Sequence, residues 1–322
     1  MTPQVDVRGL HAQLCPNAPR TQCHLCGSGE TRVSYRRCRN RRQGIAGFYD
    51  LLRCSECGCG FLDPLPSQEV LGQLYGLEYH SHVPDAPTLG KLGRMVRDML
   101  VWPYRMRYGS EAWDLPPFGR GRLLDIGCGT GHFLQVAHSK GWRCYGLDIS
   151  PSGLETACRR GCSEDLFCGG LESIPFRHDA FEMITLWHTL EHMPDPAGTL
   201  ARLRDLLTPA GRLVMAVPNL DSIEARFLGR RWIEIDVPGH LFFFTPRSLR
   251  RLIENTGLRW VRMRPQLHPS SVADAVDFLI DDLTGAVRCS QRLYLYRLLF
   301  PLVALSNVFG NQGCIEVMVE KA

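Results

Sequence analysis

Four cysteines near the start of the chain form two short knuckles with the sequence Cys-x-x-Cys-Gly, about thirty residues apart. Each knuckle can donate two thiolates to one tetrahedral zinc ion, and the glycine that follows each pair permits the tight turn. A redox dithiol would explain one knuckle but not two identical ones. Because four thiolates leave no open coordination position, such an ion is structural rather than catalytic. The predicted ligands are Cys23, Cys26, Cys54 and Cys57.

A glycine-rich turn at 127–131 follows the apolar run 122–126. Alternate glycines allow positive φ angles and let a ligand approach the backbone closely. A dinucleotide-binding turn would have its third glycine at position 132, where this chain has His132. Asp125 precedes the turn, where it repels pyrophosphate and attracts an ammonium group, and Asp148 stands where a carboxylate binds ribose hydroxyls. The turn therefore predicts a ligand with a ribose and an amino group but no phosphate, and S-adenosylmethionine (SAM) fits.

The region 121–257 resembles the class I SAM-dependent methyltransferases. Asp125 and the three glycines match the first motif of that family, and Asp148 matches its ribose-binding acid. The fourth strand begins Phe181-Glu182 rather than with the usual Phe-Asp, a small departure. The resemblance implies a cofactor site made of Asp125, Gly127, Cys128, Gly129, Gly131, Asp148, Ile149, Gly170, Leu171 and Trp187.

Three histidines and a glutamate are the candidates for acid–base chemistry. The segment 187–196 resembles the Glu-His-x-x-Asp-Pro signature of the branch that includes ubiquinone-biosynthesis O-methyltransferases. Methyl transfer mainly requires alignment of the reacting atoms, but an oxygen or nitrogen acceptor must also lose a proton, for which imidazole is well suited. We expect His188 to be the base because it lies just past the carboxyl edge of a strand. The further catalytic candidates are Glu191, His192 and His240.

Other roles for this cluster are open at the level of the sequence. Glu191 and His192 can simply cap or brace the helix that follows them. His188, Glu191 and His192 can also ligate a metal together, as the resemblance to the ubiquinone branch implies. Three later segments resemble a second signature of that branch, namely 231–232, 238–240 and 244–246.

The elements that must position these residues alternate between short apolar runs and helical periodicity, which indicates βαβ units and a parallel sheet. We predict an α/β fold: a doubly wound, seven-stranded, Rossmann-like methyltransferase sheet with a small N-terminal zinc ribbon. A Thr-Pro pair at 245–246 begins a helix that Gly257 ends. The predicted strands are 122–126, 143–147, 165–168, 181–187, 212–217, 258–263 and 314–320, with helices at 131–139, from 151, at 195–207 and at 246–257.

Composition shifts and prolines divide the chain into segments. A mostly helical insertion separates the last two strands, and its apolar run at 293–300 demands burial. The run can pack on its own domain, cover the acceptor pocket, pair two subunits or contact a lipid surface. Among the functional roles we favour a lid in which Tyr294 or Tyr296 faces the acceptor. The predicted organisation is a flexible tail at 1–20, the zinc ribbon at 21–66, a helical linker at 67–117, and the SAM-dependent methyltransferase domain at 118–322 with its insertion at about 266–312.

Charge and hydropathy limit the function and the location. The formal net charge is only +4, although seven arginines crowd the ribbon region. The longest apolar run, 293–309, contains Arg297 and Pro301 and is short for a bilayer span, so no membrane span is expected. No secretory signal is evident, and the cysteines are expected to stay reduced, which predicts a cytoplasmic protein. The arginines are Arg32, Arg36, Arg37, Arg39, Arg41, Arg42 and Arg53.

The favoured function is SAM-dependent methylation of a small-molecule or glycan-type acceptor, with oxygen as the preferred target. An RNA or ribosome-linked methyltransferase guided by the ribbon is the alternative. It is less favoured because the fourth strand ends Leu-Trp-His-Thr at 186–189, without the Pro-Pro-aromatic motif of enzymes that modify base amino groups. A SAM-binding regulator without turnover is a third hypothesis. Zinc and SAM are the expected cofactors, and the sequence leaves the oligomeric state open.

Overall fold

The computed structural model describes residues 22–40, 47–76, 121–161, 163–266 and 313–322. Several predicted segments lie outside these ranges: the tail at 1–20, nearly all of the insertion with Tyr294 and Tyr296, and most of the linker. The described part of the linker contains helix α2 (Gln68–Gly76). No helix within the described residues is long and apolar enough to cross a bilayer.

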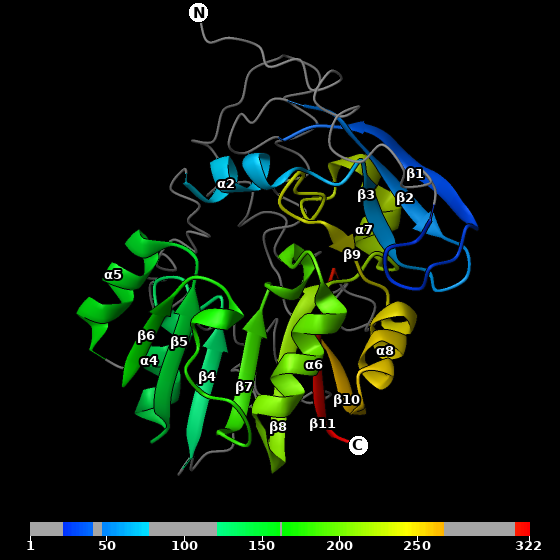
Figure 1. Cartoon of the computed structure of the whole chain (residues 1–322). Helices are drawn as coiled ribbons and strands as arrows, with labels where there is room; N and C mark the ends of the chain where they lie inside the picture. The colour runs from blue at the N-terminus through cyan, green and yellow to red at the C-terminus, as the bar shows by residue number, and fades with distance from the viewer. Residues whose placement is uncertain (1–21, 41–46, 77–120, 162, 267–312) are drawn as a thin grey trace, which may run out of the picture.

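The main sheet has seven strands in the order β10-β11-β8-β7-β4-β5-β6. The five strands from β4 to β8 run parallel, and β11 lies antiparallel between β10 and β8. This confirms the predicted seven-stranded α/β sheet (Figure 1). The strands are β4 (Arg122–Ile126), β5 (Arg143–Asp148), β6 (Asp165–Cys168), β7 (Phe181–Trp187), β8 (Leu207–Pro218), β10 (Leu258–Gln266) and β11 (Cys314–Lys321).

Both faces of this sheet are buried. Successive side chains of a strand point to opposite sides, so neighbouring residues belong to different apolar clusters. Leu124 and Ile184 contribute to one apolar cluster, whereas their neighbours Leu123 and Met183 contribute to another. Helices α6 and α8 add to the first cluster, and α4 and α5 add to the second. The helices are α4 (His132–Ser139), α5 (Pro151–Arg160), α6 (Pro196–Leu206), α7 (Ile223–Leu228) and α8 (Pro246–Asn255), with short 3₁₀ turns η1 (Leu171–Ser173), η2 (Leu190–His192) and η3 (Gly229–Arg231).

Strand β8 begins five residues earlier than the pattern predicted. Helix α6 ends at Leu206, and Leu207 already pairs with Phe181 of β7 before a shift in register. Apolar periodicity could not show this earlier start. The sequence at 208–211 is Thr-Pro-Ala-Gly, which has no alternation of apolar and polar residues and is more typical of a turn.

The cysteine-rich segment forms a second sheet in the order β1-β2-β3-β9. Its first three strands come from the N-terminal segment, but β9 belongs to the chain that follows the methyltransferase strand β8. Gly60 pairs with Phe243, and Phe61 pairs with Phe242. The ribbon and the main domain are therefore joined by backbone hydrogen bonds, which the sequence did not predict. The strands are β1 (Thr31–Cys38), β2 (Tyr49–Cys54), β3 (Gly60–Asp63) and β9 (Phe242–Phe243).

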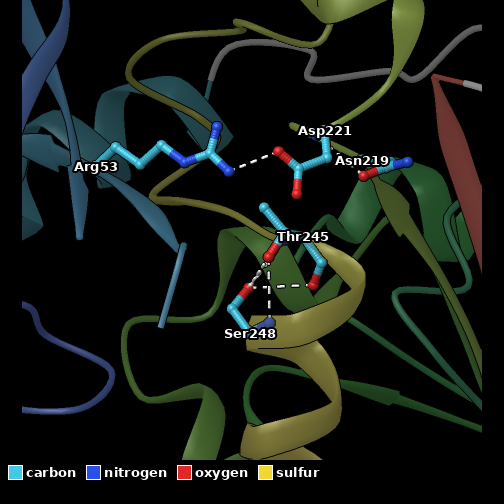
Figure 2. A network of polar contacts seen from close by, with 5 residues as sticks. All are labelled: Arg53, Asn219, Asp221, Thr245 and Ser248. Carbon is cyan, nitrogen blue, oxygen red and sulfur yellow. Dashed lines mark hydrogen bonds and ion pairs between the residues drawn. The ribbon is translucent and has the colours of Figure 1, made fainter. Parts of the chain in front are cut away.

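Polar contacts strengthen this junction (Figure 2). Arg53, which precedes a predicted zinc ligand on β2, lies 2.5 Å from the Asp221 carboxylate in the loop after β8. The backbone N–H of Asp221 donates to the Asn219 side chain at 3.0 Å. Close by, Thr245 caps helix α8: its hydroxyl accepts from the Ser248 backbone, and the Ser248 hydroxyl accepts from the Thr245 backbone.

Candidate functional site

The glycine-rich turn connects β4 to α4 and holds all three glycines in the left-handed region, at φ 73°, 50° and 76°. Two of them are closely packed: a Cβ on Gly127 would lie 2.4 Å from the Thr189 hydroxyl, and one on Gly131 would lie 2.8 Å from Ala157. A Cβ on Gly129 would meet nothing within 4 Å. The turn is therefore supported from beneath at its two ends and open at its middle, where a ligand can approach the backbone.

Asp148 ends β5 beside this open position. One carboxylate oxygen accepts the backbone N–H of Gly129 at 2.7 Å, and the other accepts that of Ser150 at 2.8 Å. The side chain is only partly buried, so each oxygen keeps acceptor capacity toward the open side. This donor set fits SAM: a carboxylate for the ribose hydroxyls stands next to a cradle that has no side chain.

Asp125 is buried and accepts the Thr185 hydroxyl at 2.7 Å. Burial raises its pKa to about 8, the Thr185 hydrogen bond lowers it, and the nearby Asp148 charge raises it. Its carboxyl is therefore largely protonated near neutral pH. The predicted attraction of an ammonium group requires the ionised form, which a cation bound beside it would favour.

The other predicted cofactor residues lie around the same edge of the sheet. Ile149 follows Asp148 and is 54% exposed, although its side chain is large and apolar. Gly170 directly precedes turn η1, in which Leu171 is half-buried. The Cys128 thiol packs beneath the turn, because a Cβ on Gly146 would lie 2.7 Å from its sulfur. Cys128 can therefore offer a ligand only its backbone. Trp187 is half-buried and packs against Phe133.

The histidine cluster begins directly after β7. His188 has a positive φ of 53° and places its ring between two side chains: Nε2 is 2.9 Å from Gln266 Oε1, and Nδ1 is 3.5 Å from Glu191 Oε1. Burial is the largest influence on its pKa and lowers it. The Glu191 contact, the Glu234 charge and the Gln266 hydrogen bond together outweigh burial and raise the pKa to about 9. The ring is thus an imidazolium near neutral pH, the form that donates a proton.

Glu191 is fully buried, and within the described residues neither carboxylate oxygen has a hydrogen-bond partner apart from the ionic contact with His188. Burial alone would raise its pKa. His188, His240 and His192 outweigh burial and lower the pKa, so the carboxylate stays ionised. A buried charge of this kind needs a cationic neighbour, which His188 supplies.

His192 and His240 pack edge to face, with ring centroids 4.7 Å apart. His192 Nδ1 lies 2.9 Å from the Gly239 carbonyl, and His240 Nδ1 lies 2.7 Å from the Glu234 carbonyl. Because a carbonyl only accepts, both rings carry a proton on Nδ1. Burial, followed by the influence of His240, lowers the pKa of His192 to about 4, so this ring is neutral and its Nε2 holds the lone pair.

Three residues that the sequence did not single out complete this region. Gln266 ends β10, Cys314 begins β11, and Glu234 lies in the segment before β9, with the Cys314 thiol 3.8 Å from its carboxylate. Only Glu234 left a signal in the sequence, as an acid within the apolar run 232–244. The possible metal-ligand atoms fall into two sets, each within 4.8 Å, which differ from the predicted one: Glu191 with His192 and His240, and His188 with Glu234 and Cys314.

The four predicted zinc ligands come together at one end of the second sheet. Their sulfur atoms all lie within 4.8 Å of one another, with Cys23–Cys57 and Cys26–Cys54 both at 3.6 Å. Four sulfurs at about 2.3 Å from a zinc ion would be about 3.8 Å apart, so the donor set fits a closed tetrahedral site. The hydrogen bond from Cys57 lowers the pKa of Cys23 to about 5, which favours the thiolate that a metal binds.

The sheet order and the glycine turn define the class I SAM-dependent methyltransferase fold. A family model described as a methyltransferase domain matches residues 106–262, and the chain contains a SAM-dependent methyltransferase domain. It is 28% identical over 125 residues to a malonyl-[acyl-carrier protein] O-methyltransferase of Serratia marcescens, covering 39% of this chain and 48% of the relative.

A ubiquinone biosynthesis O-methyltransferase of Burkholderia pseudomallei is 28% identical over 154 residues, covering 44% of this chain and 66% of the relative. The chain thus spans between about half and two thirds of the length of these curated relatives. A solved SAM-dependent methyltransferase from Mesorhizobium loti has a TM-score of 0.44 at 18% identity, covering 69% of this chain and 98% of that one.

Proposed function

We propose that the protein transfers the methyl group of SAM to a hydroxyl oxygen of a small-molecule or glycan-type acceptor. The methyltransferase domain supports the reaction class. Oxygen as the target is supported by the two curated relatives described above, both of which are named as O-methyltransferases. The proposal extends to the ribbon, which we assign one structural zinc ion on the basis of its four sulfur atoms.

One observation carries this proposal: the cofactor turn and the histidine cluster are in direct contact. Thr189, which stands between His188 and Glu191, packs against Gly127 and donates its hydroxyl proton to the Ile126 carbonyl at 3.1 Å. Thr189, which directly follows His188, is thus hydrogen-bonded to the last residue of β4, the strand that leads into the glycine-rich turn. Methyl transfer requires this proximity, because donor and acceptor must be aligned for in-line displacement.

SAM supplies an electrophilic methyl group on a sulfonium, and the acceptor oxygen displaces the neutral thioether. The protein's own residues would bind SAM and remove the proton from the acceptor hydroxyl. Asp148 would hold the ribose, and Gly129 would leave room for the amino-acid portion. The departing hydroxyl proton would go to His192 Nε2, because Nδ1 already donates to the Gly239 carbonyl. The sequence had favoured His188, whose two ring nitrogens contact Gln266 and Glu191; we keep His188 as the alternative base, and the variants below decide between the two.

The test is to incubate the zinc-loaded protein with SAM and a panel of phenols, sugars, glycans and structured RNA, and to measure S-adenosylhomocysteine. Turnover with a hydroxylated small molecule or glycan is expected. Replacement of the base, by His192→Gln, should lower kcat by about 10²–10⁴-fold with little change in SAM affinity, and His138→Gln on exposed α4 is the matched control.

Each other outcome selects a different function. Methylation of RNA alone would replace the proposal by the RNA-linked alternative. Tight SAM binding without transfer to any acceptor would identify a regulator. If His188→Gln abolishes turnover while His192→Gln does not, His188 is the base. A strict requirement for an added divalent ion would instead favour the metal hypothesis for this cluster.

A further inference from the structure

A cavity of about 420 Å³ on the ribbon side of the molecule is lined by arginines from two distant segments. Its volume is in the range of small-molecule binding sites. We call it the arginine pocket. Its lining includes Arg36, Arg37 and Arg39 at the end of β1 and beyond, Arg230 of η3, and the apolar side chains of Phe48 and Ile235.

The backbone of β1 is distorted where it enters the pocket. The register with β2 shifts between Tyr35 and Cys38, and Arg37 has a positive φ of 53°. Asp50 holds this bulge: its carboxylate accepts the Arg37 backbone N–H at 2.8 Å and lies 3.4 Å from the Arg36 guanidinium. Bulges re-aim side chains, and a non-glycine residue with positive φ is strained, so such a conformation often marks a functional position.

Arg230 reaches the same cavity from a different part of the chain. It precedes Trp232, which is buried in the core shared by the ribbon and the main domain. Another lining residue, Ile235, directly follows Glu234, whose carbonyl accepts from His240. The arginine pocket and the histidine cluster therefore involve consecutive residues of one segment.

The charges and the apolar wall indicate the kind of ligand. Four guanidinium groups line the pocket, and the Asp50 carboxylate contacts two of the residues that carry them, Arg36 and Arg37. A nucleoside diphosphate carries about three negative charges near neutral pH, and guanidinium groups match phosphate oxygens in geometry. Phe48 is 54% exposed, with the Arg37 guanidinium 4.3 Å from its ring centroid, so an apolar surface adjoins the cationic groups.

We propose that the arginine pocket binds a nucleoside diphosphate, either as a free ligand or as the phosphate-bearing part of the acceptor. Binding itself does not depend on methyl transfer, so this inference can fail while the proposed function holds, and the reverse.

The test is calorimetric titration of the zinc-loaded full-length protein with uridine and adenosine diphosphates, inorganic pyrophosphate and uridine. We expect the diphosphates to bind, pyrophosphate to bind more weakly and uridine not to bind. Arg230→Gln and Arg36→Gln should each raise the Kd about 10–100-fold. Arg250→Gln, an exposed ion-paired arginine of α8, should leave the Kd unchanged. Phe48→Ala should weaken binding of the nucleotides but not of pyrophosphate.

Turnover distinguishes the two sources of the ligand. If a nucleotide-linked sugar is methylated and Arg230→Gln raises its KM, the pocket holds part of the acceptor. If nucleotides bind without being methylated, they are a separate ligand. SAM binding by each variant serves as the control for folding. The proposal is overturned if no diphosphate binds, if Arg230→Gln binds like the wild type, or if only a longer single-stranded RNA binds.

Discussion

His188 adopts a left-handed backbone conformation that few residues other than glycine tolerate, and its ring thereby reaches both Glu191 and Gln266. These contacts make its proton binding very different from that of His192, four residues away. The pKa of the first ring is raised to about 9 and that of the second is lowered to about 4. Two groups of one residue type are thus kept in opposite charge states near neutral pH, a pattern typical of acid–base sites.

The titration of His188 is directly measurable. Nitrogen NMR of the ring should show a midpoint near pH 9, and Glu191→Gln should lower it, because the variant removes the Glu191 charge that opposes the effect of burial. Since the folded-state pKa is raised, the associated stabilisation is fully present below about pH 6.5 and is lost as the pH rises through about 9. A midpoint that does not respond to Glu191→Gln would contradict this assignment, and His138→Gln is the control.

Asp148→Ala should weaken SAM binding by about 1.5–3 kcal/mol, the value of a charge-assisted hydrogen bond. The carboxylate has two roles here, since it also binds the Gly129 backbone, and Asp148→Asn separates them by keeping one acceptor oxygen. Calorimetry on folded variants is the measurement, with Glu155→Ala on the exposed side of α5 as the control. Wild-type affinity of Asp148→Ala would reject the role.

At this scale, the sequence was informative wherever a site is made from neighbouring residues. The cysteine knuckles and the glycine turn are each set by local spacing, and the structure brings their members together as predicted. Gln266, Glu234 and Cys314 come from three distant segments. Nothing in the local sequence of Gln266 or Cys314 indicates that the ends of β10 and β11 contribute to the region around His188 and Glu234.

At the scale of elements, hydrophobic periodicity found all seven strands of the main sheet. It missed β9, because a strand of two residues, Phe242 and Phe243, has no period to detect. The pairing of β3 with β9 is therefore a tertiary feature that local pattern cannot express. The same limit applies to the arginine pocket, which depends on η3 lying against the end of β1.

The antiparallel pair of strands β10 and β11 contains a buried ion pair that can be tested. Arg264 and Glu316 form two contacts, at 2.8 and 2.9 Å, and both side chains are almost fully buried. Arg264→Leu should destabilise the fold by about 3–5 kcal/mol, because it leaves a buried carboxylate without its partner. Chemical denaturation is the measurement. Arg264→Leu combined with Glu316→Leu should recover most of the loss; a double variant no better than the single would refute the pairing argument.

At the scale of the whole molecule, the ribbon is connected to the histidine cluster by a short series of backbone contacts. Leu62 of β3 donates to the Leu241 carbonyl at 3.2 Å, and Leu241 donates to the Glu191 carbonyl at 2.8 Å. A disturbance of the ribbon is therefore expected to reach the acceptor side before the SAM side. The boundary predicted at residue 66 marks a change in the sequence pattern. In the structure, backbone hydrogen bonds join the segments on either side of that boundary.

Native mass spectrometry should find one zinc ion per chain, lost in Cys26→Ser, because four sulfurs form the closed site. Without the ion, kcat should fall more than SAM affinity does, since β3 no longer supports the Leu241–Glu191 contact. Cys158→Ser, an exposed thiol on α5, is the matched control. A folded protein free of metal, or Cys26→Ser that keeps its full zinc content, would disprove the site.

The pairing of Phe61 with Phe242 also has a consequence for synthesis on the ribosome. Strand β3 emerges roughly 180 residues before β9, a wait of about 10–40 s at typical translation rates. Both cysteine knuckles are complete by Cys57, so zinc can close the ribbon while one edge of its sheet still lacks a neighbour. An unpaired strand edge is prone to pair with another chain. Early zinc binding would thus order the nascent ribbon during the time before β9 is synthesised and can pair with the free edge of β3.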